Sequence, residues 1–257
     1  MSTRHLPSDT PTSPTTAVVT GAAGGLGSVI TRRLHAVGHR VVVADINGAG
    51  ARALAAELSP DGDTALALTL DVSGREGFVS ALVEITDHWG TPEILVNNAA
   101  VTRAADVMTL DTEDFDEVLT TNVNSIFFGC QVFGSAMAEK GYGRIVNMAS
   151  LAGQNGGTAT GAHYAASKGA ILTANKIFAK EFATSGVTVN ALSPGPHDVD
   201  IVHRTVGDRL DAIVAGIPVH RLGDPGFLAD TVELLTRPDA YFVTGACWDI
   251  NGGLYVR

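Results

Sequence analysis

Basic residues are scarce in this 257-residue chain, which holds 17 Lys and Arg against 27 Asp and Glu and has a formal net charge of −10. A nucleic-acid-binding protein needs a basic face, and an anionic membrane surface attracts basic residues, so we expect neither partner. Long apolar runs are also missing, since none reaches the roughly 18 residues that span a bilayer. The sequence therefore predicts no membrane span.

Cysteine is nearly absent as well. The two cysteines, Cys130 and Cys247, have neither the spacing of metal ligands nor the number of a disulfide framework, so no metal site is expected. Residues 1–15 are rich in Ser, Thr and Pro and lack the apolar segment of a secretory signal, which predicts a flexible N-terminal tail. Together these absences predict a soluble protein of the reducing cytoplasm.

What the sequence does contain is an alternation of short β-branched runs with longer helical patterns. Strands are expected at residues 16–20, 40–45, 64–70, 93–99, 143–150, 187–193 and 247–252. Helices are expected at residues 25–37, 48–58, 74–89, 112–139 and 162–185. Apolar strands joined by helices form a parallel sheet covered on both faces. Residues 16–257 are thus predicted to form one α/β domain, a doubly wound Rossmann fold of about seven strands.

A glycine-rich turn, "TGAAGGLG", follows the first expected strand and opens the first expected helix. Glycine permits a tight turn and lets the backbone approach a ligand closely, and the N-terminus of a helix attracts a pyrophosphate. The strand–turn–helix context therefore predicts that Gly21, Gly25, Leu26 and Gly27 bind a dinucleotide cofactor.

The second expected strand ends in an aspartate, Asp45, about two dozen residues after Gly21. An acidic group at this place accepts hydrogen bonds from the adenosine ribose hydroxyls and repels the extra phosphate of NADP. Residue 24 is glycine, and no Arg or Lys follows Asp45 closely. NAD is the expected cofactor, and NADP is the less favoured one.

These residues and several later motifs resemble the short-chain dehydrogenase/reductase family from about residue 15 to the end of the chain. The motifs occur in the family's order: "TGAAGGLG" (20–27), "LDV" (70–72), "NNAA" (97–100), Asn122 in "TTNVNS", Ser150 in "NMAS", "YAASK" (164–168), "SPGP" (193–196) and "DINGGLY" (249–255). The resemblance implies a catalytic tetrad of Asn122, Ser150, Tyr164 and Lys168. It further implies cofactor contacts by Asp71, Val72, Asn98, Ala99, Tyr164, Lys168, Pro194, Gly195 and His197. A homotetramer is also implied.

Tyr164 and Lys168 are four residues apart, so they share one face of the expected helix. A phenol has a pKa of about 10, and a neighbouring ammonium favours the phenolate, so we expect Lys168 to lower the pKa of Tyr164. Tyr164 then exchanges a proton with a substrate hydroxyl or carbonyl oxygen. By the resemblance, Ser150 donates to that oxygen, Lys168 also binds the nicotinamide ribose, and Asn122 holds a water for proton transfer.

Two segments depart from the family pattern. Val199 stands where many relatives have a threonine, in an expected substrate lid at 196–217 that also contains Asp198 and His203. The interval between Ser150 and Tyr164 is one residue longer, and Gln154 within it is expected to contact substrate together with Ser150 and Tyr164. His163 is expected to be structural or interfacial.

Three functions remain open from the sequence. The favoured one is an NAD-dependent oxidoreductase acting on a secondary alcohol or its ketone. The chain also resembles 3-oxoacyl-carrier-protein reductases, so reduction of a 3-oxoacyl-carrier-protein or 3-oxoacyl-CoA is the alternative. A non-catalytic NAD-binding regulatory protein is the alternative of another class, and the presence of both Tyr164 and Lys168 argues against it.

Overall fold

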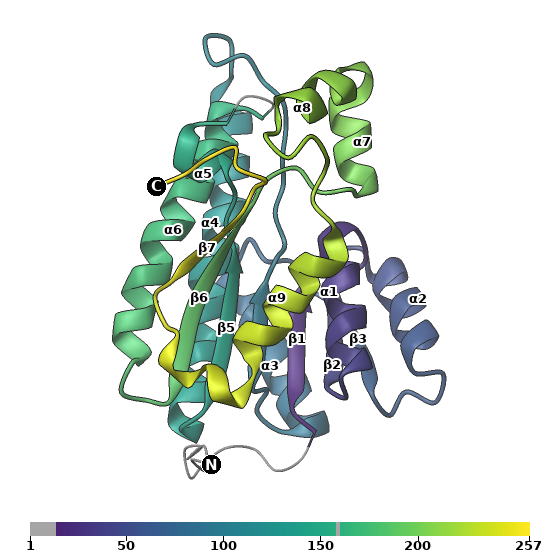
Figure 1. Cartoon of the computed structure of the whole chain (residues 1–257). Helices are drawn as coiled ribbons and strands as arrows, with labels where there is room; N and C mark the ends of the chain where they lie inside the picture. The colour runs from purple at the N-terminus through teal and green to yellow at the C-terminus, as the bar shows by residue number, and fades with distance from the viewer. Residues whose placement is uncertain (1–13, 158–159) are drawn as a thin grey trace, which may run out of the picture.

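One parallel sheet runs through the molecule (Figure 1), and a computed structural model describes it for residues 14–157 and 160–257. Its strand order is β3-β2-β1-β4-β5-β6-β7, with every pairing parallel. The strands are β1 (Thr16–Thr20), β2 (Arg40–Asp45), β3 (Ala65–Thr69), β4 (Ile94–Asn97), β5 (Gly143–Met148), β6 (Val187–Pro194) and β7 (Cys247–Ile250). This arrangement confirms the predicted doubly wound α/β fold and its seven strands.

Helices cover both faces of the sheet (Figure 1). They are α1 (Gly25–Ala36), α2 (Gly48–Leu58), α3 (Arg75–Trp89), α4 (Thr112–Lys140), α5 (Ala152–Asn155), α6 (Ala162–Phe182), α7 (Asp200–Val206), α8 (Leu210–Gly216) and α9 (Pro225–Thr236), with 3-10 turns η1 (Gly207–Arg209) and η2 (Pro238–Phe242). The five expected helices are present, whereas α5, α7, α8 and α9 were not expected. A start signal for α9 exists in the sequence, because Asp224 accepts from Gly226 N and Pro225 opens the helix.

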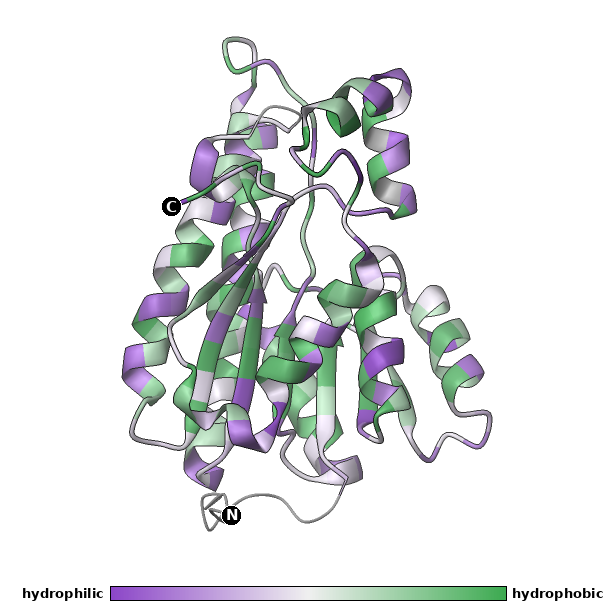
Figure 2. Cartoon of the chain, viewed as in Figure 1, coloured by the Kyte–Doolittle hydropathy of each residue, from purple (hydrophilic) through white to green (hydrophobic). Residues whose placement is uncertain are grey.

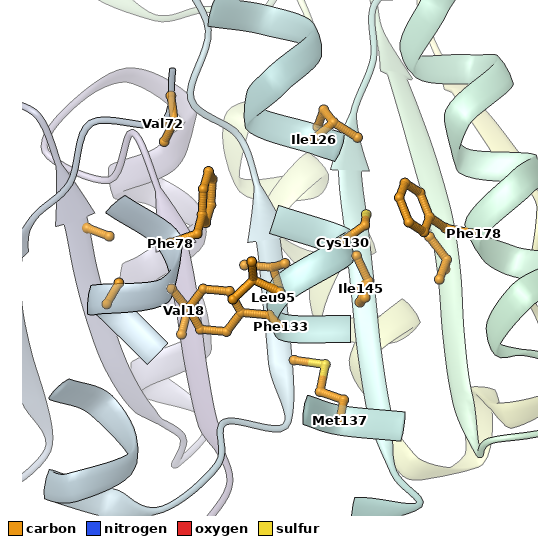
Figure 3. Close-up of a cluster of buried hydrophobic side chains, with 14 of the residues drawn as sticks. Val18, Val72, Phe78, Leu95, Ile126, Cys130, Phe133, Met137, Ile145 and Phe178 are labelled. Carbon is orange, nitrogen blue, oxygen red and sulfur yellow. The ribbon is translucent and has the colours of Figure 1, made fainter. Parts of the chain in front are cut away.

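Alternate side chains of each strand enter two separate cores. Val18 joins the core under α3, α4 and α6, whereas Val19 joins the core under α1, α2 and α9. Figure 3 shows the first core, where Phe78 of α3 and Phe133 of α4 meet edge to face with ring centres 6.3 Å apart. The strands at the centre of the sheet are hydrophobic over most of their length (Figure 2), as expected when both faces are buried.

A ladder of buried amides crosses the first core. Asn97 Nδ2 of β4 donates to Asn147 Oδ1 of β5 at 2.9 Å, and Asn147 Nδ2 donates to Asn175 Oδ1 of α6 at 3.1 Å. Asn175 Nδ2 in turn donates to the carbonyl of Ala246, just before β7, at 3.3 Å. Buried amides have strong geometric requirements, so the ladder fixes how α6 sits on the sheet.

The predicted N-terminal tail covers residues 1–15, of which the last two are described. Residues 1–13 lie outside the described residues. Thr15 is described, and its carbonyl accepts from Arg40 N, which extends the pairing of β1 with β2. Among the helices of the described ranges, none is both long enough and apolar enough to cross a membrane.

Replacing Asn147 with alanine tests the amide ladder. Asn147→Ala leaves Asn97 Nδ2 and Asn175 Oδ1 buried without these partners, so we expect a loss of about 2–4 kcal/mol in the free energy of unfolding. Urea denaturation measures it as a lower midpoint at an unchanged slope. Asn155→Ala is the control, because Asn155 is exposed and its loss costs about 0.5 kcal/mol or less. Equal losses in both variants would contradict the role of the ladder.

Candidate active site

The glycine-rich turn between β1 and α1 forms a cradle whose shape depends on missing side chains. A Cβ on Gly27 would lie 2.1 Å from the Gly21 carbonyl oxygen, and Gly21 and Gly25 have φ of +64° and +52°. Nothing lies within 4 Å of a Cβ built on Gly24 or Gly25. Gly24 is the N-cap of α1, so no side chain caps its first N–H groups, while Leu26 packs partly against the core. The cradle therefore offers free backbone N–H groups to an anion.

The glycine-rich turn is bound to the segment that follows β4 through Thr20, Asn98 and Ala99. Thr20 Oγ1 accepts from the backbone N of Asn98 and of Ala99, each at 3.0 Å. Asn98 Nδ2 donates to the carbonyls of Thr20 and Gly21, at 2.9 and 3.2 Å. The side chain of Asn98 thus supports the shape of the cradle. We call these contacts the Thr20–Asn98 joint.

Asp45 is fixed beside the cradle. Its Oδ2 accepts from Ala23 N at 2.9 Å and its Oδ1 from Asn47 N at 2.8 Å. The carboxylate therefore stands where β2 ends and next to the glycine-rich turn, as the sequence predicted for a group that binds the adenosine ribose.

One basic side chain of α2, that of Arg52, lies close to Gly48, the first residue of that helix. Arg52 is seven residues after Asp45, but α2 turns it back so that its Nη1 would be 3.2 Å from a Cβ on Gly48. The helical spacing i, i+4 between Gly48 and Arg52 was the signal that could have found it. Arg52 is exposed, so the prediction that Asp45 has no basic neighbour stays a prediction.

Asp71 and Val72 follow β3 and differ in exposure. Val72 is 8% exposed and belongs to the first core, whereas Asp71 is exposed. The backbone N–H of Ser73, and then its hydroxyl, hydrogen-bond the Asp71 carboxylate and lower its pKa. Asp71 is thus a charged group at the same edge of the sheet as Asp45.

Tyr164 and Lys168 lie one turn apart near the start of α6. Lys168 is 3% exposed, its Nζ donates to the Met148 carbonyl at 2.7 Å, and Nζ is 5.5 Å from the centre of the Tyr164 ring. Burial lowers the pKa of Lys168 to about 8. Burial also raises the pKa of Tyr164, against which its hydrogen bond with Ser150 acts.

The expected lowering of the Tyr164 pKa by Lys168 is therefore wrong for the chain by itself. Desolvation disfavours both the phenolate and the ammonium, and it is the largest cause of the raised pKa of Tyr164 and of the lowered pKa of Lys168. The sequence could not supply this result, because i, i+4 spacing sets the shared face but not the depth of burial.

Ser150 stands two residues after β5 and faces Tyr164. Its Oγ accepts from Ala152 N at 3.1 Å, so the hydroxyl hydrogen is free to donate to another oxygen. The Ser150 hydroxyl lowers the pKa of Tyr164, so the two side chains lie within reach of each other. The structure therefore brings together the two hydroxyls that were expected to hold a substrate oxygen.

Asn122 is fully buried in α4 and is used to hold the chain after β4. Its Oδ1 accepts from Val101 N at 2.8 Å, and its Nδ2 donates to Val101 O and to Ser167 Oγ, both at 3.0 Å. The side chain joins α4, α6 and the segment after β4. Its predicted role in holding a water stays a prediction.

The segment after β6 carries the next three expected cofactor contacts. Pro194 ends β6, Gly195 N donates to Ile250 O at 2.8 Å, and His197 Nδ1 hydrogen-bonds Gly195 O at 2.9 Å. His197 is 2% exposed and its ring packs on Gly223. Burial lowers the pKa of His197, which favours the neutral ring.

Both polar atoms of the Gln154 amide are hydrogen-bonded to other residues of the chain. Its Oε1 accepts from Ser193 Oγ at 2.9 Å, and its Nε2 donates to Asp249 Oδ1 at 2.7 Å. The expected substrate contact would have to replace these bonds. These two bonds could not be predicted from local spacing, because Ser193 and Asp249 are 39 and 95 residues away from Gln154 in the chain.

The expected lid consists largely of α7 and α8. Val199 is the N-cap of α7, and His203 Nε2 lies 2.6 Å from Asp198 Oδ1. His163 is fully buried at the start of α6, and neither ring nitrogen has a hydrogen-bond partner among the described residues. In those residues, no group of three or more His, Cys, Asp or Glu could hold a metal ion.

Comparison with known proteins decides the family. A family model described as enoyl-(acyl carrier protein) reductase matches residues 21–255. The chain is 36% identical to the 3-oxoacyl-[acyl-carrier-protein] reductase FabG of Vibrio cholerae over 240 residues, 93% of this chain and 97% of that protein. The chain belongs to the short-chain dehydrogenase/reductase family.

Two further relatives cover nearly all of the chain. Acetoacetyl-CoA reductase of Cupriavidus necator is 36% identical over 241 residues, 93% of this chain and 98% of that protein. Nodulation protein G of Azospirillum brasilense is 37% identical over 239 residues, 93% and 97%. As a member of this family, the chain is an oxidoreductase that acts on CH–OH or keto groups and binds a nicotinamide cofactor.

The glycine cradle fits such a cofactor, and a glycine-to-alanine substitution in it tests whether it binds the cofactor. Gly27→Ala forces a Cβ against the Gly21 carbonyl, so the turn must move. The first N–H groups of α1 then no longer point at the pyrophosphate. We expect the Kd for the preferred reduced cofactor to rise about tenfold or more, measured by fluorescence titration. Gly74→Ala is the control, since Gly74 lies outside the cradle and a Cβ there would be 3.7 Å from its nearest neighbour, Glu76 Oε2. Unchanged affinity in Gly27→Ala would contradict the assignment of the cradle.

Lys168 should lower stability at neutral pH. Its pKa is about 8 in the folded chain against an ordinary value of 10.5. Between these values the unfolded chain binds more protons, so stability rises with pH. Lys168→Met removes this effect, and at pH 7 we expect it to be more stable than the parent by about 2–3 kcal/mol.

Thermal unfolding from pH 7 to pH 10.5 measures the difference, which should shrink as the pH rises. Lys176→Met is the matched control, because Lys176 is exposed on the same helix. A Lys168→Met variant that is less stable at pH 7 would contradict the cost of burying this ammonium.

Proposed function

We propose that the chain is an NAD-dependent oxidoreductase that transfers a hydride between nicotinamide and a secondary alcohol or ketone, with Tyr164 as general acid and base. The observation that carries the proposal is the buried Lys168, whose Nζ lies 5.5 Å from the centre of the Tyr164 ring, with the Ser150 hydroxyl close enough to Tyr164 to lower its pKa. Two hydroxyls that face each other beside a buried cation can bind one substrate oxygen and exchange its proton.

The residues divide the work in the oxidising direction as follows. Ser150 donates its hydroxyl hydrogen to the alcohol oxygen and holds it beside Tyr164. Tyr164 accepts the hydroxyl proton while the carbinol hydrogen leaves as hydride. Lys168, when protonated, favours the phenolate form of Tyr164. The nicotinamide supplies the hydride acceptor, and its electronic chemistry belongs to the cofactor. In the reducing direction Tyr164 returns the proton to the new alkoxide oxygen.

Asp45 supports NAD as the cofactor. Its carboxylate is held by Ala23 N and Asn47 N next to the glycine cradle, where a negative charge repels a second phosphate on the ribose. Arg52 lies beside Gly48 at the start of α2, and a basic side chain near the adenosine ribose would favour NADP.

A second candidate is reduction of a 3-oxoacyl thioester. It is favoured by the names of the relatives, 3-oxoacyl-[acyl-carrier-protein] reductase and acetoacetyl-CoA reductase. A non-catalytic NAD-binding regulator is the least supported alternative, because the Ser150–Tyr164 pair and the buried Lys168 would serve no purpose in it.

We also propose a homotetramer with a small-molecule substrate and no nucleic-acid partner. Two apolar areas support more than one contact between subunits. Phe127 of α4 and Ile177 of α6 are 44% and 61% exposed, and Phe227 of α9 and Phe242 of η2 are 61% and 90% exposed. The cysteines of the described part, Cys130 and Cys247, are free thiols, which fits the cytoplasm as the proposed location.

A substrate panel tests the proposed function. Purified protein is incubated with secondary alcohols of cyclic, aromatic, steroid and 3-hydroxyacyl thioester classes, with NAD and NADP in parallel, and formation of the reduced cofactor is followed by fluorescence. We expect turnover with NAD on a free alcohol. Turnover confined to thioesters would favour the second candidate, and turnover confined to NADP would overturn the inference from Asp45.

Tyr164→Phe tests the mechanism on whichever substrate is found. The phenyl ring keeps the packing but cannot exchange a proton, so we expect kcat to fall at least a hundredfold while the Kd for the cofactor stays within about threefold of the parent value. Activity that survives this substitution undiminished would show that another group transfers the proton.

A further inference from the structure

The turn that carries Ser150 is packed directly on the catalytic helix. α5 begins two residues after Ser150, and a Cβ on Gly153 would lie 2.5 Å from the backbone carbon of Lys168. Leu151 N donates to Pro194 O at 3.0 Å. The position of the Ser150 hydroxyl therefore depends on how α5 sits between α6 and the end of β6.

The side chain of Gln154 connects α5 with the ends of β6 and β7. It accepts from Ser193 Oγ at 2.9 Å and donates to Asp249 Oδ1 at 2.7 Å. Ser193 is fully buried and directly precedes Pro194. A carboxylate can only accept hydrogen bonds, so Asp249 fixes the amide with its NH2 group toward β7 and its oxygen toward β6.

Asp249 is itself held in place. Arg257 Nε donates to Asp249 Oδ2 at 2.8 Å, and Arg257 Nη2 donates to the Cys247 carbonyl at 2.6 Å. The side chain of Asp249 is 21% exposed and that of Arg257 is 49% exposed. Figure 1 shows the last residues of the chain passing beside α5. Arg257 thus limits the freedom of the carboxylate that Gln154 binds.

We propose that Gln154, Asp249 and Arg257 form a positioning bridge that holds the Ser150 turn in place relative to the chain after β6. The inference rests on the proposed function, and it assigns Gln154 a role other than contact with substrate. The bridge touches no reacting atom. It fixes the distance between the Ser150–Tyr164 pair and the Pro194–His197 segment where the nicotinamide is expected, and misplacement by about 1 Å can reduce a rate a hundredfold.

The test introduces a second carboxylate into the bridge and then replaces the carboxylate opposite it with an amide. Gln154→Glu sets two carboxylates against each other, which raises the pKa of one of them or drives the turn away. Adding Asp249→Asn restores a donor opposite the new carboxylate. Glu57→Gln is the matched control, because it removes one carboxylate from an exposed pair with Arg32 on the remote α1–α2 side. Each variant is measured without cofactor by hydrogen–deuterium exchange of residues 150–157, and with cofactor by kcat, KM and the cofactor Kd.

We expect Gln154→Glu at pH 8.5 to exchange faster in residues 150–157 and to lose about tenfold or more in kcat, with the cofactor Kd within about twofold of the parent value. The effect should shrink toward pH 6, where the two carboxylates share a proton. In the double variant both exchange and kcat should return to within about threefold of the parent values.

Three results would overturn the bridge: unchanged exchange in Gln154→Glu, faster exchange with unchanged kcat, or no recovery in the double variant. If the parent protein turns over no compound at all, the proposed function fails. The exchange of residues 150–157 and its recovery then decide by themselves whether the bridge positions the turn.

Discussion

The hydrogen bonds between the ends of β1 and β4, the Thr20–Asn98 joint, are the constraint on which the site depends. One hydroxyl and one carboxamide bind four backbone groups of two different connections. Because the carboxyl ends of parallel strands meet at one edge of the sheet, this joint sets the height of the glycine cradle relative to the segment after β4. Asn122 then fixes that segment, through Val101, against α4 and α6. The cofactor cradle and the catalytic helix are connected by a short series of buried polar contacts.

The sequence allowed the sheet and the positions of most candidate site residues on it to be predicted, because both depend on local spacing, while the roles of those residues stay predictions. The turn glycines, Asp45 at the end of β2 and the i, i+4 pair on α6 are each defined by their neighbours in the chain. The features that were missed depend on distance across the fold. Gln154, for example, is bound by residues 39 and 95 positions away. The depth of Tyr164 and Lys168, which sets their pKa values, is likewise a product of packing.

Burial of the proposed catalytic pair, Tyr164 and Lys168, lowers the stability of the fold but also shifts the pKa values on which the proposed chemistry depends. An ammonium that is 3% exposed, with one carbonyl as its hydrogen-bond partner, is an expensive group to bury. The chain tolerates it because two cores and a parallel sheet covered on both faces supply ample apolar burial elsewhere. Burial brings the pKa of Lys168 to about 8, so its charge can change near neutral pH, where a proton must move.

The amide ladder of Asn97, Asn147 and Asn175 has a consequence for how this enzyme can change over evolution. Asn175 lies eleven residues after Tyr164 on the same helix, so a slip of α6 by one residue would break the ladder and displace the tyrosine together. The ladder therefore keeps α6 in one register relative to the sheet. Changes in α7, α8 and the turn after Ser150 leave this ladder intact, so those segments can vary while Tyr164 keeps its place.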